Sequence, residues 1–151
     1  MSQHGPPVLP LDDPRIAVLL HSTHAPVTAR PRWWTAWAQA FDQTPLLVAV
    51  PGEAASSQVG ELLALAPLAT ATTGRTATVS VLGGTSADAA RLPACDDTAA
   101  RALAEKLAAT LAALPRPWHL FLEHLPPGDP TAQRLAELLP GARWTLRRDR
   151  R

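Results

Sequence analysis

The clearest hydrophobic periodicity in the chain lies between residues 103 and 114, where leucines recur at intervals of three and four residues. This spacing gathers the leucines on one face of a helix and leaves charged residues on the other. The Asp-Asp-Thr sequence at residues 96–98 supplies residues that cap helix starts, and Pro115 prevents continuation. The sequence therefore predicts a helix from about residue 98 to residue 114.

A two-residue alternation between residues 76 and 82 predicts a strand with alanine and valine on one face and hydroxyl side chains on the other. Two earlier apolar segments, residues 46–50 and 61–70, are also predicted as strands. Short turns separate the three segments, so we expect an antiparallel meander. Pro67 lies inside the middle strand and cannot donate a ladder hydrogen bond, which predicts a bulge or an edge position there.

Three of the five tryptophans fall in one short segment that is predicted to be helical. Pro31 is a favourable first helical residue, and the helix is expected to end near Asp42. Trp34, Trp37 and Phe41 follow the i, i+3, i+7 spacing of one helix face. We interpret this aromatic stripe as part of the core rather than as a ligand cage.

The remaining periodic segments predict three more strands and one more helix. The wholly apolar run Ile16–Leu20 is typical of a short strand covered on both faces. Residues 118–125 and 144–148 are also predicted as strands, and a helix is expected from Pro130 to about Leu139 because leucines recur there after an Asp-Pro start.

The predicted order is β-α-β-β-β-α-β-α-β, which indicates an α/β or α+β fold with one mixed sheet of about six strands. The helices are expected on both faces of the sheet, and part of the sheet is expected to be parallel through right-handed crossovers. We expect residues 1–13 to be a disordered leader, residues 14–147 to form a single domain, and residues 148–151 to be a basic tail.

Charge and composition exclude several classes of protein. The net charge of +1 gives no support to nucleic-acid binding or to attachment at an anionic membrane. No apolar run reaches the length of about 18 residues that a membrane span needs. The single cysteine, Cys95, precludes a disulfide framework within the chain, so a cytoplasmic protein is expected. The five histidines show no convincing metal-ligand spacing, and no metal is predicted.

Four stretches, taken together, resemble the GNAT acyltransferase superfamily. The closest likeness is to the N-terminal half of tandem GNAT proteins known as cellulose-biosynthesis-type acetyltransferases. The likeness is carried by Pro31–Val50 with its Trp-Trp-x-x-Trp-x-x-x-Phe pattern, Leu62–Leu68, Val81–Gly84 with Asp88 shortly after, and Trp118–Pro130.

This resemblance implies an N-acyltransferase with acetyl-CoA or another acyl-CoA as cosubstrate. It would place acyl-CoA contacts at Val81, Leu82, Gly83, Gly84, Thr85 and Ser86, a substrate contact at Asp88, and a general base at Glu123. Helix starts and loops of small residues can present backbone N–H groups to a pyrophosphate.

Each of these residues also has a structural interpretation. Glu123 is either a base that deprotonates an acceptor amine or an outward-facing carboxylate at a strand end. Asp88 either positions a substrate or caps a turn. Gly83 and Gly84 either contact acyl-CoA or provide a tight exit from the strand.

The chain also departs from the GNAT pattern. The helix expected to receive the pyrophosphate begins with Asp96 and Asp97, whose charges would repel it, and the chain contains no tyrosine to act as general acid. The alternative hypothesis is a catalytically degenerate GNAT-fold scaffold that forms a homodimer or binds a second GNAT-like chain.

Overall fold

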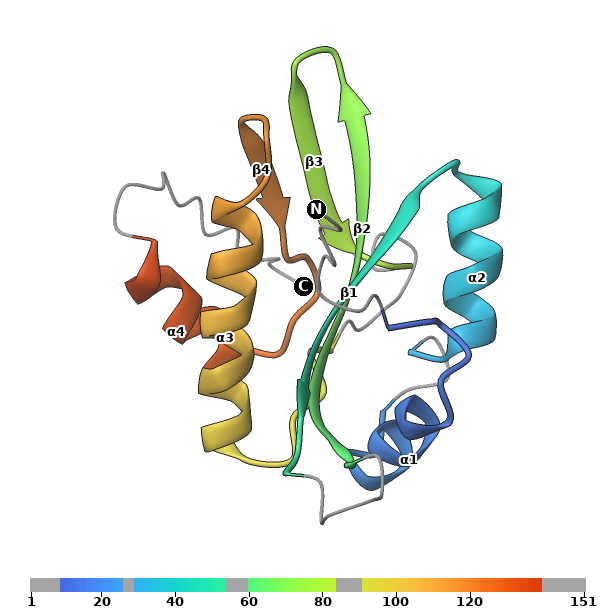
Figure 1. The fold of residues 1–151 in the computed structure, drawn as a ribbon, viewed down its shortest axis with the longest axis vertical. Helices are drawn as coiled ribbons and strands as arrows, with labels where there is room; N and C mark the ends of the chain where they lie inside the picture. Colours follow the sequence, from blue (N-terminus) through green and yellow to red (C-terminus); the bar gives the residue numbers. More distant parts are fainter. Residues whose placement is uncertain (1–8, 26–28, 54–59, 84–90, 140–151) are drawn as a thin grey trace, which may run out of the picture.

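The computed structural model describes residues 9–25, 29–53, 60–83 and 91–139. Over these ranges the chain is a mixed α/β protein of four helices and a four-stranded sheet (Figure 1). In chain order the elements are α1 (Pro14–Ser22), α2 (Pro31–Ala40), β1 (Thr44–Pro51), β2 (Leu62–Thr73), β3 (Thr76–Val81), α3 (Asp97–Ala112), β4 (Trp118–Phe121) and α4 (Pro130–Leu138).

The sheet has the strand order β1-β2-β3-β4. The first three strands form the predicted antiparallel meander, and β4 pairs with β3 in parallel after the chain has passed through α3. The prediction of a partly parallel sheet is therefore confirmed. Four of the six expected strands are found, as β1 to β4. The run at Ile16–Leu20 is not a strand, and the strand expected at residues 144–148 lies outside the described residues.

The predicted strand at Ile16–Leu20 is wrong, because this run lies inside helix α1. Asp13 caps the helix by accepting a hydrogen bond from the Arg15 backbone N–H at 2.9 Å, and Pro14 occupies its first turn. Ile16, Leu19 and Leu20 have the 3–4 spacing of a helix face and are buried, whereas Val18 is 59% exposed. A short apolar run has the same composition in a strand and in a buried helix, so the Asp-Pro start decides between them.

Pro67 lies within the interior strand β2 and not at a bulge, so the predicted bulge is wrong, whereas on the side of β3 it lies beyond the end of the ladder. The register shift in the ladder falls between Val50 and Pro51 instead. The ladder of β2 with β3 ends at Leu68 and Val81, and the Pro67 carbonyl accepts a hydrogen bond from the Leu82 N–H at 2.8 Å. N–H and C=O of one strand residue point to the same side, so the missing donor of Pro67 faces the end of β3, where no ladder continues.

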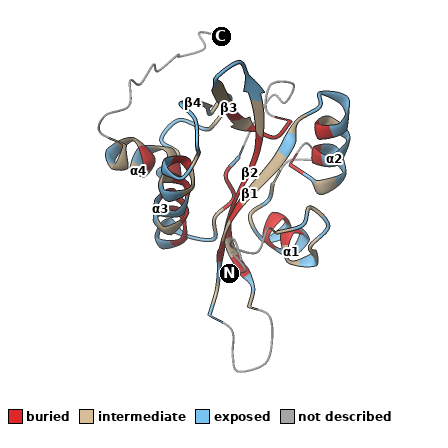
Figure 2. Ribbon diagram, turned by 45° about the horizontal axis from the view of Figure 1, so that its top comes forward, coloured by how far each residue is buried: buried red, intermediate tan, exposed pale blue. Residues whose placement is uncertain are grey.

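The sheet separates two hydrophobic clusters (Figure 2). One cluster packs α3 and α4 against one face through leucines that are fully buried, namely Leu103, Leu107, Leu111 and Leu135. The other cluster packs α1 and α2 against the opposite face, where Leu65 and Ala69 of β2 meet Ile16 and Trp34. Helices therefore cover both faces of the sheet, as predicted.

Helix α2 confirms the predicted aromatic helix, but a different set of aromatic residues shares its outer side. Trp34 is 1% exposed and lies in the core, whereas Phe41 is 58% exposed. Trp33 and Trp37 have ring centroids 6.1 Å apart, and Trp37 and Phe41 have centroids 4.2 Å apart. Trp33, Trp37 and Phe41 therefore share one side of the helix at i, i+4, i+8 spacing, with Trp33 and Phe41 exposed and Trp37 half-buried against the α1 and α2 cluster.

Candidate functional site

The parallel strands β3 and β4 part soon after they meet. Their ladder covers four pairs and ends with Ser80 opposite Phe121. Beyond this point the chain after β3 passes through a turn at Leu82 and Gly83, and the chain after β4 turns at His124, which has a φ of 61°. Crevices outside the carboxyl ends of neighbouring parallel strands are common ligand sites in open α/β sheets.

The segment that returns after β3 forms one wall beside this point. Ala94 forms an isolated antiparallel bridge with Ala64 of β2. The Leu65 N–H donates to the Pro93 carbonyl, and the Cys95 N–H donates to the Leu63 carbonyl, each at 2.9 Å. Strand β2 thus pairs with β3 along one half and with residues 93–95 along the other, which brings the start of α3 back to the same end of the sheet as α4.

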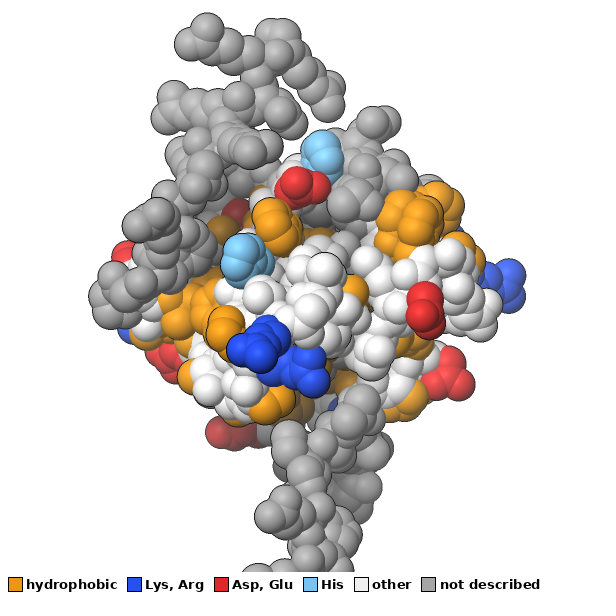
Figure 3. Space-filling view, turned by 90° about the horizontal axis from the view of Figure 1, so that it is seen from above, with side chains coloured by type: hydrophobic (Ala, Val, Ile, Leu, Met, Phe, Trp, Pro, Cys, Tyr) orange, Lys and Arg blue, Asp and Glu red, His pale blue; other side chains and the backbone are white. Residues whose placement is uncertain are grey.

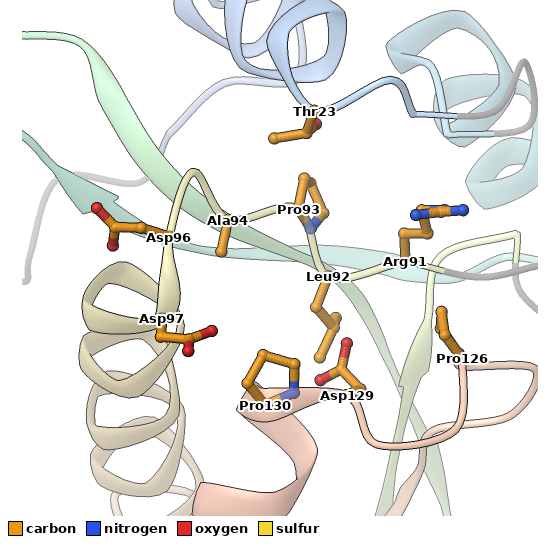
Figure 4. Close-up of a pocket in the computed structure, with 10 residues that line it drawn as sticks. All are labelled: Thr23, Arg91, Leu92, Pro93, Ala94, Asp96, Asp97, Pro126, Asp129 and Pro130. Carbon is orange, nitrogen blue, oxygen red and sulfur yellow. The ribbon is translucent and has the colours of Figure 1, made fainter.

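A crevice of about 200 Å³ lies between the segment that follows β3 and the segment that follows β4 (Figure 4). Its lining residues are Thr23, Arg91, Leu92, Pro93, Ala94, Asp96, Asp97, Pro126, Asp129 and Pro130. The volume is below the roughly 300–1,000 Å³ of typical small-molecule pockets. The crevice could hold a small group or a peptide side chain rather than a whole nucleotide cofactor.

Carboxylates dominate the polar lining of the crevice. Asp96 caps α3 by accepting a hydrogen bond from the Ala99 N–H at 2.7 Å, and Asp129 caps α4 by accepting one from the Ala132 N–H at 2.9 Å. The carboxylates of Asp97 and Asp129 point toward the space between the two helix starts (Figure 4). The positive ends of both helices are therefore already paired with the protein's own anions.

Asp129 is a partly buried carboxyl group in the crevice. Burial raises the pKa of Asp129, and the backbone N–H groups of Ala132 and Thr131 oppose this rise. Arg91, which is exposed, is the one basic residue among the lining residues, against three aspartates. A pyrophosphate would meet net negative charge here, so the crevice does not fit the diphosphate of acyl-CoA.

The described part of the predicted acyl-CoA segment is buried in the protein rather than open to the crevice. Val81 packs in the α3 and α4 cluster, and Leu82 packs in the α1 and α2 cluster. Gly83 has a φ of 76°, and a Cβ added to it would lie 2.5 Å from Nε1 of Trp33. The indole of Trp33 therefore lies against the backbone of Gly83, and both the conformation and this contact require glycine. Gly84, Thr85, Ser86 and Asp88 lie outside the described residues.

Glu123 does not lie on a strand as predicted, because β4 ends at Phe121. It is exposed in the turn that follows β4, and it is not among the residues that line the crevice. His124 shares this turn, whereas His119 is on β4. The described ranges contain no group of three or more His, Cys, Asp or Glu side chains that is placed to hold a metal ion.

Cys95 lies at the rim of the same region, between the bridge to β2 and the cap of α3. Partial desolvation raises the pKa of its thiol, and the neighbouring Asp96 carboxylate raises it further. A neutral thiol is a poor nucleophile, so the local chemistry does not favour catalysis by Cys95.

A second feature is the stripe of Trp33, Trp37 and Phe41 on α2, which we call the aromatic surface. Trp33 is 38% exposed and Phe41 is 58% exposed. Viewed from above, one group of hydrophobic side chains lies at the surface over α2, and it is separate from the hydrophobic side chains nearer β4 (Figure 3). Tryptophan and phenylalanine are enriched in protein interfaces because they bury much area with little loss of side-chain entropy.

The sequence pattern did not identify the crevice residues Arg91, Asp97 and Asp129 as neighbours. The sequence does contain a pattern that predicts their proximity, because Asp96 and Asp129 each cap a helix that follows one of two strands predicted to be parallel. Helices after adjacent parallel strands begin at the same edge of the sheet. The two caps could therefore have been expected to lie close together.

No protein-family model, curated protein or solved structure matches the chain. Among the helices in the described ranges, none has the length and apolar character needed to cross a membrane.

Proposed function

We propose that the chain is a GNAT-related domain that serves as one half of an acyl-CoA-dependent N-acyltransferase. In this proposal it supplies a binding surface for a second GNAT-like half and does not itself perform acyl transfer. Part of the expected order supports this proposal: an antiparallel meander is followed by a helix, a parallel strand and another helix.

The observation that carries the non-catalytic part is the charge of the crevice between the segments that follow β3 and β4. Its two helix starts are capped by Asp96 and Asp129, and Asp97 adds a third carboxylate. These groups disfavour the pyrophosphate of acyl-CoA at the place where a GNAT enzyme would bind it. The Trp33 indole against Gly83 further limits access to the backbone at the end of β3.

Isothermal titration of the full chain with acetyl-CoA tests this part directly. We expect no measurable binding by the chain alone up to millimolar ligand. An active transferase is the second candidate, favoured by the parting of β3 and β4 after Ser80 and Phe121. In that case Glu123 is the residue proposed to act as base, acetyl-CoA binds, and Glu123→Gln lowers the rate of acyl transfer to an amine.

The aromatic surface is the proposed contact for the second half. In the absence of such a chain, we expect a second copy to occupy it, giving a homodimer of the 16.0 kDa chain. Light scattering coupled to size exclusion measures the mass. The double variant Trp37→Ser/Phe41→Ser is expected to be monomeric.

A matched control is Val18→Ser, because Val18 is 59% exposed on α1, outside the aromatic surface. This variant should leave the mass unchanged. A wild-type chain that stays monomeric at high micromolar concentration would contradict the partner-binding part, whereas acetyl-CoA binding would contradict the non-catalytic part. The partner-binding part and the non-catalytic part of the proposal can therefore be contradicted independently.

A further inference from the structure

The two faces of the sheet differ in how far the described helices cover them. On one face the α3 and α4 cluster includes side chains of all four strands, and the Lys106 ammonium of α3 reaches β1, where it donates to the Ala49 carbonyl at 2.9 Å. On the other face the α1 and α2 cluster draws on β1, β2 and Leu82, but contains no residue of β3 or β4. In both ribbon views α2 lies on the β1 side of the molecule, away from β4 (Figures 1 and 2). No described helix therefore packs on the β3 and β4 half of this face.

The side chains on this half of the sheet follow from the alternation of β3 and β4. Every second side chain of the two strands packs against the α3 and α4 cluster, so the side chains between them point to the opposite face. We call this group the open face, and it consists of Thr78 and Ser80 of β3 with His119 and Phe121 of β4. Phe121 is large and apolar, yet it is 46% exposed. The open face therefore offers apolar area that nothing in the described ranges buries.

The aromatic surface of α2 lies close to the open face. The indole of Trp33 lies against Gly83, which follows Ser80 by three residues and is therefore within about 11 Å of it. Ser80 is paired with Phe121 in the ladder. Of the four large hydrophobic side chains that are exposed in the described ranges, Trp33, Phe41 and Phe121 belong to these two surfaces, and Val18 does not. A single partner can therefore cover three of the four.

We propose that α2 of a second copy covers the open face, and that two copies form a two-fold dimer with two equivalent contacts. In each contact, the aromatic surface of one copy packs on the open face of the other, which brings Phe41 of one copy close to Phe121 of the other. A two-fold interface permits this arrangement, because a residue that contacts a second residue across the interface is also contacted by it in return. The inference rests on the proposed partner contact through the aromatic surface, and it adds the surface that receives this contact.

Area favours this arrangement over a contact between the two α2 helices alone. Helix α2 has 10 residues and presents a side about 15 Å long and about 10 Å wide. One contact of this size is small beside the roughly 800 Å² that each partner buries in a standard interface. The reciprocal arrangement uses both α2 and the open face of each copy, which about doubles the contact. It also supplies a helical layer to the half of the sheet that lacks one among the described elements.

Charge is consistent with a second copy as the partner. The open face contains no Asp, Glu, Lys or Arg, so a strongly acidic or basic partner would find no opposite charge on it. The aromatic surface is bordered by Ala36 and Ala40, which are exposed and lie three or four residues from Trp33 and Trp37 on the helix. Each copy can therefore cover the other without burying an unpaired charge.

A pair of charge variants of the full chain tests the proposal. In a homodimer, Phe41→Arg or Phe121→Glu places an unpaired charge in both contacts, so each variant should raise the dissociation constant about tenfold or more. In an equimolar mixture, the heterodimer has one unaltered contact and one in which the introduced arginine faces the introduced glutamate. Its dissociation constant should be at least about tenfold below that of either variant alone.

Sedimentation velocity measures these constants, with one variant carrying a fluorescent label on Cys95, the single cysteine of the chain, which is exposed. Val18→Arg is the matched control, because Val18 is 59% exposed and lies outside both surfaces, so the dissociation constant should not change. Both substituted phenylalanines are exposed, and far-UV circular dichroism establishes that each variant is folded.

The outcomes separate this inference from the proposed function. A wild-type chain that remains monomeric contradicts the partner contact itself, and the inference with it. A dimer that Phe121→Glu leaves as tight as the wild type overturns the inference alone, and the contact through the aromatic surface stands. A heterodimer no tighter than the two variant homodimers also overturns the inference, because it would place α2 of one copy against α2 of the other.

Discussion

The helical layers on the two faces of the sheet are built from different side chains and are completed to different extents. The α3 and α4 layer is aliphatic, and its four inward leucines are fully buried. The α1 and α2 layer buries Trp34 but leaves Trp33 and Phe41 substantially exposed. The inward side chains of the α3 and α4 layer are therefore fully buried, whereas the α1 and α2 layer retains exposed apolar area that is available for contact.

Substitution of Trp34 should have the largest effect and should separate the two sides of α2. Trp34→Ala removes the largest fully buried side chain, and we expect a loss of about 3–5 kcal/mol in the free energy of unfolding. Phe41→Ala, on the exposed side, should change it by no more than about 0.5 kcal/mol. Urea denaturation followed by circular dichroism measures both, and equal losses would contradict the division of α2 into a core side and an open side.

Leu107 provides the corresponding test in the aliphatic layer. Leu107→Ala leaves a cavity beneath a residue that has no exposed surface, and a loss of about 2–5 kcal/mol is expected. Arg101→Ala, on the outward side of α3, is the matched control and should stay within about 0.5 kcal/mol of the wild type. If Leu107→Ala cost less than its control, the packing of α3 on the sheet would have to be rejected.

The contact between Trp33 and Gly83 joins the open layer to the end of β3, and two glycines allow its effect to be isolated. Gly83→Ala should cost about 1–3 kcal/mol, because alanine is strained at a φ of 76° and its Cβ meets the indole. Gly74→Ala has a similar φ of 61° but no neighbour within 4 Å, so it should show the strain alone and cost less.

Thermal denaturation compares the two glycine variants, and each is repeated in a Trp33→Ala background. There the cost of Gly83→Ala should fall toward that of Gly74→Ala. A cost that is unchanged by the removal of the indole would show that the contact plays no part.

The smallest expected effect is a difference in pH dependence between two helix caps. Burial raises the pKa of Asp129, whereas the side-chain hydrogen bond from Arg15 lowers the pKa of Asp13. The contribution of Asp129 is present below the unfolded pKa, near 3.9, and is lost as pH rises through its raised folded pKa. The contribution of Asp13 is present above the unfolded pKa and is lost as pH falls through its lowered folded pKa.

Substitution by asparagine preserves both caps and removes both titrations. In melting curves recorded between about pH 2 and about pH 6, Asp129→Asn should reduce the decline of stability above the unfolded pKa. Asp13→Asn should reduce the decline below it. Shifts of the same sign in the two variants would contradict the assigned causes.

The elements with long or complete patterns were predictable from the sequence. The leucines at residues 103–114 and the alternation at residues 76–82 gave α3 and β3 with errors of one or two residues at most ends. Ile16–Leu20 was misassigned because a five-residue apolar run fits both kinds of element. Phe41 was assigned to the wrong side of α2, because a helix of ten residues can bury either of two overlapping stripes and the packing of Trp34 decides between them.

The crevice was not predictable from spacing alone. Asp96 and Asp129 are 33 positions apart, and they meet because two parallel strands, each followed by a helix, end at the same edge. The acidic start of α3 was visible in the sequence, and its effect on anion binding could be argued there. That the second cap joins it, and that burial raises the pKa of Asp129, depends on the tertiary arrangement.

The hydrogen bond from Lys106 to Ala49 has a practical consequence, because Lys106 is the single lysine of the chain. Reagents that acylate primary amines can modify only this side chain and the terminal amine. An ammonium group engaged with a strand carbonyl must leave it before it reacts, so the acylation rate of Lys106 reports how often this hydrogen bond between α3 and β1 opens. Acylation of Lys106 thus gives a chemical measure of one contact between α3 and β1.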